Sequence, residues 1–199
     1  MELRVAGLAI SRGDLVLAND LSFAVAGGGA LVVTGENGSG KSTLLRTLAG
    51  LHPPDAGTVT LTIEGDGAPV GEAAHYLGHA NAMKADLSVR ENLAFWAGAL
   101  EGSEDAIAEA AGPLAIEALL DLPFHYLSAG QRRRVALARL WVAPRPLWLM
   151  DEPTAALDRR SEGAVRDMIE AHRAEGGMVV AATHVDLGLR DAASLTMGA

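Results

Sequence analysis

Residues 35–42 combine glycines with a lysine and a hydroxyl at a fixed spacing. They read Gly-Glu-Asn-Gly-Ser-Gly-Lys-Ser, which matches the pattern G-x-x-x-x-G-K-[ST] at every fixed position. The glycines let the backbone curl so that its N–H groups point inward, the lysine reaches the β- and γ-phosphates, and the last hydroxyl binds Mg²⁺. A glycine-rich turn with a purely structural role would need neither of these side chains. The residues predicted to bind the nucleotide are Gly35, Glu36, Asn37, Gly38, Ser39, Gly40, Lys41, Ser42 and Thr43, with Ser42 as a metal ligand.

A second segment places two carboxylates side by side at the end of an apolar run. The stretch Leu147-Trp148-Leu149-Met150-Asp151-Glu152 reads as a buried strand, and ligands bind at the C-terminal ends of strands in open α/β sheets. We expect Asp151 to hold Mg²⁺, usually through water, and Glu152 to orient and deprotonate the water that attacks the γ-phosphate. Taken alone, the pair could be a polar strand exit. Together with residues 35–42 it predicts hydrolysis and not binding alone.

The elements that must position these groups alternate between strands and helices. Ala30–Thr34 is a short apolar run that leads into a helical pattern, and Leu147–Met150 and Met178–Ala182 are similar buried runs. A helix is expected near Ser161–Ala174. Strands that alternate with helices predict a mostly parallel core sheet. Apolar residues at alternate positions near the N-terminus predict an antiparallel β layer: Leu3, Val5, Leu21, Phe23, Val25, Val59, Leu61 and Ile63.

A helical insertion is expected before the strand that carries the carboxylates. Ser88 and Glu91 have the spacing of a capping box, which opens a helix over Asn92–Leu100. A second helical stretch is expected over roughly Glu104–Leu120. Because the sequence shows no linker or repeat, we expect one α/β domain over residues 1–199, with the insertion at approximately 84–128.

The composition restricts the class of protein. With 49% apolar and 21% charged residues, the 199-residue chain can form a sizeable core, and no apolar run approaches the ~18 residues that span a bilayer. The start of the chain has no secretory signal pattern, so we expect a cytoplasmic protein. The absence of cysteine excludes disulfides and thiolate metal ligands. A net charge of −9 argues against general nucleic-acid binding.

A third segment, Leu127-Ser128-Ala129-Gly130-Gln131, precedes a predicted helix over Arg132–Val142 and contains another capping-box spacing. It resembles the LSGGQ signature of ABC ATPases, with alanine in place of the first glycine. The resemblance covers nearly the whole chain and implies a P-loop ABC ATPase fold with ATP as the substrate. In that family the helix N-terminus binds the γ-phosphate of an ATP held by a second ATPase subunit. The residues implied here are Ser128, Ala129, Gly130 and Gln131.

Two further positions follow in the order that the family requires. Ala155-Ala156-Leu157-Asp158 resembles the D-loop, which crosses the interface between the two subunits. His184 follows the expected strand and resembles the switch histidine that contacts the γ-phosphate. The resemblance therefore implies a catalytic role for His184 beside Glu152, and an interface role for Asp158.

The chain departs from the family at two positions. The family usually has a glutamine that contacts Mg²⁺ and water, but this chain reads Gly78-His79-Ala80-Asn81 there, with Ala80 at the glutamine position. Either His79 or Asn81 takes the place of the glutamine, or coupling to the membrane partner at this position depends on Mg²⁺ and Glu152 alone. An aromatic residue usually stacks on adenine. This chain has Arg12, whose planar guanidinium could stack instead or could be solvated in a turn.

Several segments resemble the ATP-binding subunits of cytochrome c maturation haem exporters. The similarity lies in residues 75–79, 83–93 and 122–134. It implies two ATPase subunits, integral membrane permease partners that handle the haem, and a peripheral position on the cytoplasmic face of the bacterial inner membrane. Phe95 and Trp96 either contact the permease or pack the insertion's own core.

Three alternatives share part of this pattern. The chain could serve another ABC exporter, which only the identity of its partners would distinguish. A soluble ABC protein of ribosomes or DNA repair would usually show two cassettes or a long coiled-coil insertion, and the sequence shows neither. A P-loop kinase would share residues 35–42 but has no use for residues 127–131. The basic triplet Arg132–Arg134 more often serves the site or solvent than nucleic acid.

Overall fold

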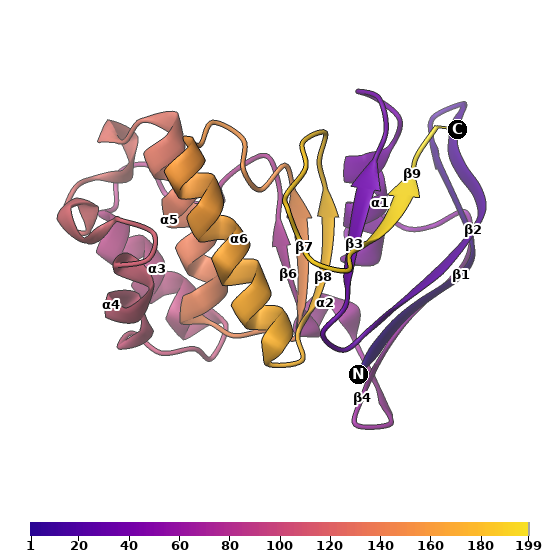
Figure 1. Ribbon diagram of the computed structural model, residues 1–199, viewed down its shortest axis with the longest axis horizontal. Helices are drawn as coiled ribbons and strands as arrows, with labels where there is room; N and C mark the ends of the chain where they lie inside the picture. The colour runs from indigo at the N-terminus through magenta and orange to yellow at the C-terminus, as the bar shows by residue number, and fades with distance from the viewer. Residues whose placement is uncertain (199) are drawn as a thin grey trace. The chain divides into compact units, whose positions relative to one another are not determined.

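The structure is a computed structural model that describes residues 1–198 (Figure 1). Contacts within the chain define two compact units. The sheet unit comprises Met1–Gly78, Arg145–Glu152 and the residues from Ile169 onward, and the helical unit comprises His79–Pro144 and Pro153–Met168. Within residues 1–198, no helix is both long enough and apolar enough to cross a bilayer.

The core of the sheet unit is a five-stranded parallel sheet. Its strand order is β6-β7-β8-β3-β9, and every neighbouring pair is parallel. All residues of β7 and β8 are buried, which explains why both strands read as continuous apolar runs. The predicted parallel core is therefore confirmed. The strands are β3 (Ala30–Thr34), β6 (Ala74–Leu77), β7 (Leu147–Asp151), β8 (Met178–Ala182) and β9 (Ala193–Thr196), and helix α1 (Lys41–Leu48) packs on β7 and β8 (Figure 1).

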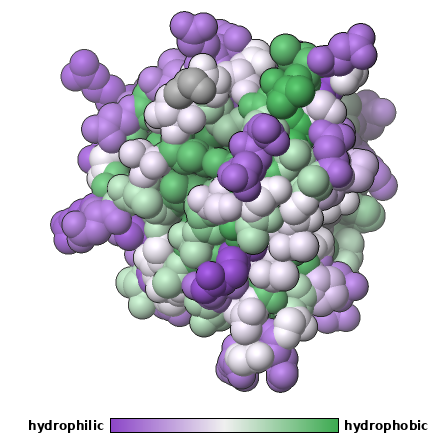
Figure 2. Space-filling view, turned by 90° about the vertical axis from the view of Figure 1, so that its right-hand side faces the viewer, coloured by the Kyte–Doolittle hydropathy of each residue, from purple (hydrophilic) through white to green (hydrophobic). Residues whose placement is uncertain are grey.

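A four-stranded antiparallel sheet in the order β2-β1-β4-β5 completes the sheet unit. Its strands are β1 (Glu2–Arg12), β2 (Leu15–Ala26), β4 (Ala56–Ile63) and β5 (Asp66–Ala68), and the short helix α2 (Val70–Ala73) follows them. Every neighbouring pair of strands in this sheet is antiparallel, so the predicted antiparallel layer is confirmed. The side that carries β1 and β2 shows hydrophobic patches between hydrophilic side chains (Figure 2). The exposed large apolar residues of β2 are Leu15 and Val16.

The helical unit is built around α5 (Ala129–Val142), which packs against α3 (Val89–Ala99) and α4 (Ala106–Ala111). Both capping boxes form: Ser88 caps α3 and Ser128 caps α5. Each helix therefore begins directly after its capping serine, about one turn earlier than predicted. The 3₁₀ turns η1 (Glu117–Leu119) and η2 (Phe124–Tyr126) connect these helices, and α6 (Arg159–Ala174) begins in this unit and ends in the sheet unit.

The predicted helical stretch over Glu104–Leu120 is wrong in its extent, because α4 ends at Ala111. Pro113 follows two residues later, and proline has no N–H to continue the helical hydrogen bonds. Ala115 then takes a positive φ of 49°, so the chain turns before it forms η1. An apolar pattern of helical period thus continued across a break that the proline imposes.

Candidate functional site

In the loop between β3 and α1 of the sheet unit, Gly35, Gly38 and Gly40 have positive φ angles. Gly35 has φ 138°, and a side chain there would collide with the carbonyl oxygen of Met197 and lie 2.8 Å from the Oγ of Ser39. The Lys41 side chain is buried, and its Nζ donates to the carbonyl oxygens of Gly35 at 2.7 Å and Glu36 at 2.9 Å. The ammonium group therefore lies on the same loop as the N-terminus of α1, where a polyanion would bind.

Ser39 adds a second sign of an anion site in this loop. Its Oγ is buried, and it finds no hydrogen-bond partner among residues 1–198. Buried hydroxyls usually have partners, so one without a partner needs an explanation. A phosphate oxygen would supply the missing acceptor.

Two apolar side chains beside the loop were missed by the sequence reasoning. A Cβ on Gly40 would lie 2.9 Å from the Cβ of Leu17 and 3.3 Å from the Cε of Met197, so both side chains contact this glycine. Arg12 is exposed at the end of β1, where it pairs with Leu15 in the hairpin. The sequence reasoning did not single out Leu17, which lies in an apolar stretch of β2. It also predicted no strand over Ala193–Thr196, which leads to Met197.

The two predicted carboxylates leave β7 in different environments. Asp151 is 3% exposed and is the last residue of β7, whereas the N–H of Glu152 donates to the carbonyl oxygen of Ala182 at 2.8 Å. Glu152 has φ 47°, a left-handed conformation that non-glycine residues rarely adopt. Strained conformations of this kind gather at functional sites.

Glu152 and His184, predicted separately, lie in direct contact. The Nδ1 of His184 is 3.0 Å from both Oε1 and Oε2 of Glu152. The carboxylate side chain is 17% exposed and the imidazole 68% exposed. The ring therefore holds the carboxylate from the solvent side.

Asp151 and Ser42 lie at the same end of the parallel sheet, because α1 begins after β3 and packs on β7. The pKa of Arg46 on α1 is raised, chiefly by its hydrogen bond to the Tyr76 hydroxyl and to a smaller degree by the Asp151 carboxylate. Among the residues that the structure describes, no three His, Cys, Asp or Glu side chains form a metal cluster. A hydroxyl with one carboxylate is instead the donor set that suits Mg²⁺ bound together with phosphate oxygens.

The signature residues form the first turn of α5 in the helical unit. The Ser128 Oγ accepts from the N–H of Gln131 at 3.3 Å, and the Gln131 Oε1 accepts from the N–H of Ser128 at 2.8 Å. A Cβ on Gly130 would lie 2.8 Å from the carbonyl oxygen of Ala156, so this glycine allows residues 155–158 to approach the helix. A hollow of about 490 Å³ lies between these segments.

Asp158 is fixed at the edge of this hollow. Its Oδ1 accepts from the N–H of Ser161 at 2.8 Å, and this hydrogen bond is the main cause of its lowered pKa. Arg134 donates to the Oγ of Ser161 at 3.2 Å. The predicted D-loop residue therefore lies beside the signature, although the sequence separates them by a strand.

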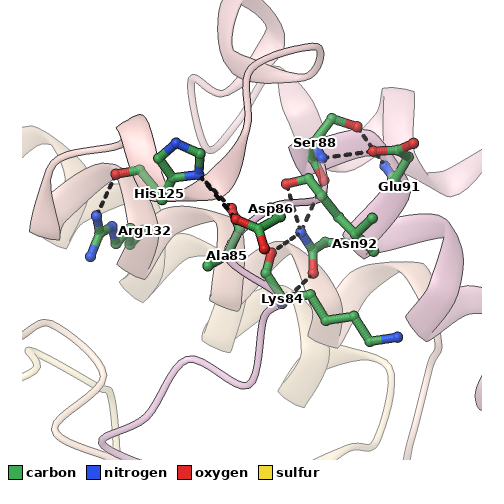
Figure 3. A network of polar contacts seen from close by, with 9 residues as sticks. Lys84, Ala85, Asp86, Ser88, Glu91, Asn92, His125 and Arg132 are labelled. Atoms are coloured by element: carbon green, nitrogen blue, oxygen red, sulfur yellow. Dashed lines mark hydrogen bonds and ion pairs between the residues drawn. The ribbon is translucent and has the colours of Figure 1, made fainter.

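Side chains of the helical unit fix the loop that contains Ala80, and Figure 3 shows their contacts with residues 84–88. Ala80 itself is exposed. Buried Asn92 donates to the carbonyl oxygens of Lys84, Leu87 and Ser88 and accepts from the N–H of Lys84. Trp96 donates to the carbonyl oxygen of Ala82 at 2.9 Å. Of the two aromatic residues left open above, Trp96 thus packs within this unit, while Phe95 remains 47% exposed.

Residues 18–155 match the ABC transporter family. The chain belongs to this family. It is 52% identical over 206 residues to the cytochrome c biogenesis ATP-binding export protein CcmA of Rhizobium meliloti (strain 1021), covering 99% of this chain and 98% of that protein. It is 50% identical to the protein of the same name from Agrobacterium fabrum (strain C58), covering 99% and 95%.

A solved structure, a putative ABC transporter ATP-binding protein from Pyrococcus furiosus, has the same fold. Its TM-score is 0.83 at 22% identity, over 98% of this chain and 97% of that one. The predicted ABC ATPase fold is therefore confirmed. Family membership supports ATP hydrolysis coupled to transport as the activity of the chain.

Proposed function

We propose that the chain is the ATP-hydrolysing subunit of a cytochrome c biogenesis export complex that transports haem. The contact between Glu152 and His184 carries the hydrolytic part of this proposal, since a carboxylate held by an imidazole is suited to activating water. The near-full-length identity to proteins named for cytochrome c biogenesis and export supports the biological part.

In this proposal the loop 35–43 binds the phosphates of ATP. Lys41 exchanges its two carbonyl contacts for contacts with phosphate oxygens, and Ser39 donates its hydroxyl to another. Ser42 and Asp151 hold Mg²⁺, which supplies charge neutralisation of the phosphates when bound. Glu152 accepts the proton of the attacking water, and His184 keeps the carboxylate oriented toward it.

The base of the nucleotide lies against the hairpin of β1 and β2. Leu17 presents an apolar side chain beside Gly40, and Arg12 presents a planar guanidinium at the end of β1. An apolar surface and a guanidinium can together bind the two faces of a purine. The aliphatic contact replaces part of the stacking that an aromatic residue would provide.

Two copies of the chain complete the ATP sites. Ser128, Ala129, Gly130 and Gln131 of one copy bind the γ-phosphate held by the other, and Asp158 lies at the interface. ATP binding closes the pair, and hydrolysis opens it. The pair drives integral membrane permease subunits from the cytoplasmic face of the bacterial inner membrane, and no nucleic acid takes part.

Phosphate release from Mg-ATP by the purified full chain tests the hydrolytic proposal. Glu152→Gln keeps the shape of the side chain but removes the base, so it should hydrolyse ATP at least about 100-fold more slowly. The same variant should sediment as a dimer with Mg-ATP, and its dimerisation should be weaker without Mg-ATP. Parental hydrolysis in Glu152→Gln would show that the carboxylate has another role.

Partner identification tests the biological proposal. Membranes from the native host are solubilised, tagged Glu152→Gln is captured with Mg-ATP, and the copurifying proteins are identified while haem absorbance is recorded. Membrane subunits of cytochrome c biogenesis would support the proposal. Recovery of a different permease would leave the proposed ATPase activity standing but would argue against haem as the transported molecule. Recovery of no membrane protein would support a soluble ABC ATPase.

A further inference from the structure

Arg133 is a buried cation that the proposed catalysis does not use. It lies on α5, is 5% exposed, and its guanidinium donates to one backbone carbonyl and to one side-chain amide oxygen. Its Nε donates to the carbonyl oxygen of Pro153 at 3.2 Å, and its Nη1 donates to the Oδ1 of Asn81 at 3.5 Å. An apolar side chain would fill this position without the cost of burying a charge. These two hydrogen bonds are contacts that an apolar side chain could not make.

The first contact concerns the residue that follows Glu152. Glu152 has φ 47°, and such a conformation persists only where the surrounding structure fixes it. On one side, its N–H is held by the carbonyl oxygen of Ala182. On the other side, the carbonyl of Pro153 is held by Arg133. A displacement of Pro153 would therefore rotate the backbone that directs the Glu152 carboxylate.

The second contact concerns the loop that contains Asn81. This loop is anchored at further points by Trp96 on Ala82 and by Asn92 on Lys84. His125 contacts the carbonyl oxygen of Ala85 (Figure 3). It moves as a single segment if these bonds persist. Arg133 is thus a direct polar link between this segment and the backbone next to Glu152.

We propose that Arg133 is a positioning residue that couples the loop of Asn81 to the orientation of Glu152. The proposal rests on the catalytic role proposed for Glu152. In this role Arg133 is not itself a catalytic residue. It sets the position of Pro153, and a shift of the Asn81 loop reaches Glu152 through the guanidinium.

Two substitutions of Asn81 test the hydrogen bond between Arg133 and the loop without replacing the buried arginine. Asn81→Asp keeps an oxygen acceptor and adds a charge that strengthens the bond, whereas Asn81→Leu has similar size but no acceptor. We expect kcat of Asn81→Leu to be about tenfold lower than kcat of Asn81→Asp, with the KM values for ATP differing less than twofold. Equal kcat in the two variants would overturn the proposal.

Substitutions of Arg133 complete a double-mutant cycle. Arg133→Gln should lower kcat about tenfold, and adding Asn81→Leu to it should lower kcat little further, because both remove the same link. Arg133→Lys keeps the cation but reaches only one acceptor, so its kcat should lie between those of the parent and Arg133→Gln. Fully multiplicative losses would overturn the coupling. If Arg133→Gln does not fold, the comparison of kcat between Asn81→Asp and Asn81→Leu still tests the proposal.

Two controls separate this proposal from the proposed function. Arg132→Gln removes the neighbouring guanidinium, which contacts the carbonyl oxygen of His125, and should keep the parental kcat. Glu152→Gln is assayed alongside. Parental hydrolysis in Glu152→Gln would refute the catalytic role of that residue, whereas slow hydrolysis in Glu152→Gln together with unchanged kcat in Asn81→Leu would refute only the role of Arg133.

Discussion

The Nδ1 of His184 lies 3.0 Å from both carboxylate oxygens of Glu152. The carboxylate is fixed from two directions, because its backbone is held to Ala182 while its side chain is held by the imidazole. A general base must be oriented before the water reaches it, since misplacement by about 1 Å can cost about 100-fold in rate. The contact therefore organises Glu152 before ATP binds.

Replacing His184 by alanine should lower kcat for ATP hydrolysis about 10- to 100-fold, because a hydrogen bond to a charged group contributes about 1.5–3 kcal/mol. Phosphate release at saturating Mg-ATP measures this. His52→Gln is a matched control, since the His52 Nε2 lies 3.3 Å from the carbonyl oxygen of Ser11 and has no proposed catalytic role. Unchanged kcat in His184→Ala would show that Glu152 does not need this contact.

The parts of the site that follow from local sequence could be predicted, and those that depend on distant segments could not. The loop 35–42 and both capping boxes are encoded by adjacent residues, so their types and spacing were sufficient. The positive φ of Glu152 and the contacts of Leu17 and Met197 with Gly40 arise from tertiary packing. Sequence periodicity contains no information about such approaches between strands.

Gly35→Ala should destabilise the chain and abolish Mg-ATP binding. The added methyl group would collide with the carbonyl oxygen of Met197 while the backbone stays at φ 138°, so we expect a loss of about 2–4 kcal/mol in the free energy of unfolding. Gly50→Ala provides the control, because Gly50 has φ 72° and nothing within 4 Å of its Cβ position. It should cost only about 1–2 kcal/mol. Urea unfolding and nucleotide titration measure both effects, and equal losses would argue against the collision.

Two helical glycines differ in the space around their Cβ positions, so alanine should have a different effect at each. Gly98 on α3 has open space at its Cβ position, so Gly98→Ala should raise the free energy of unfolding by about 0.5–1 kcal/mol. Gly130→Ala would place its Cβ 2.8 Å from the carbonyl oxygen of Ala156 and displace residues 155–158. In a Glu152→Gln background it should weaken ATP-dependent dimerisation, measured by sedimentation. Dimerisation of parental strength would show that the close approach of residues 155–158 to α5 is not needed for the second subunit.

The stability of the sheet unit should fall below pH 7 because of His172. Its ring stacks on Trp148 with centroids 3.9 Å apart and planes 3° apart, and burial lowers its pKa to about 4. Between about pH 6.5 and pH 4 the unfolded chain binds a proton that the folded chain does not, so stability decreases as the pH falls through this window and is constant above it. Allowing for the partial exposure of the ring, the loss should be about 1–3 kcal/mol. His172→Phe keeps an aromatic ring without the proton and should remove this component from urea unfolding measured at pH 7 and pH 5, whereas His52→Gln should retain it. An unchanged pH dependence in His172→Phe would assign the acid sensitivity to other groups.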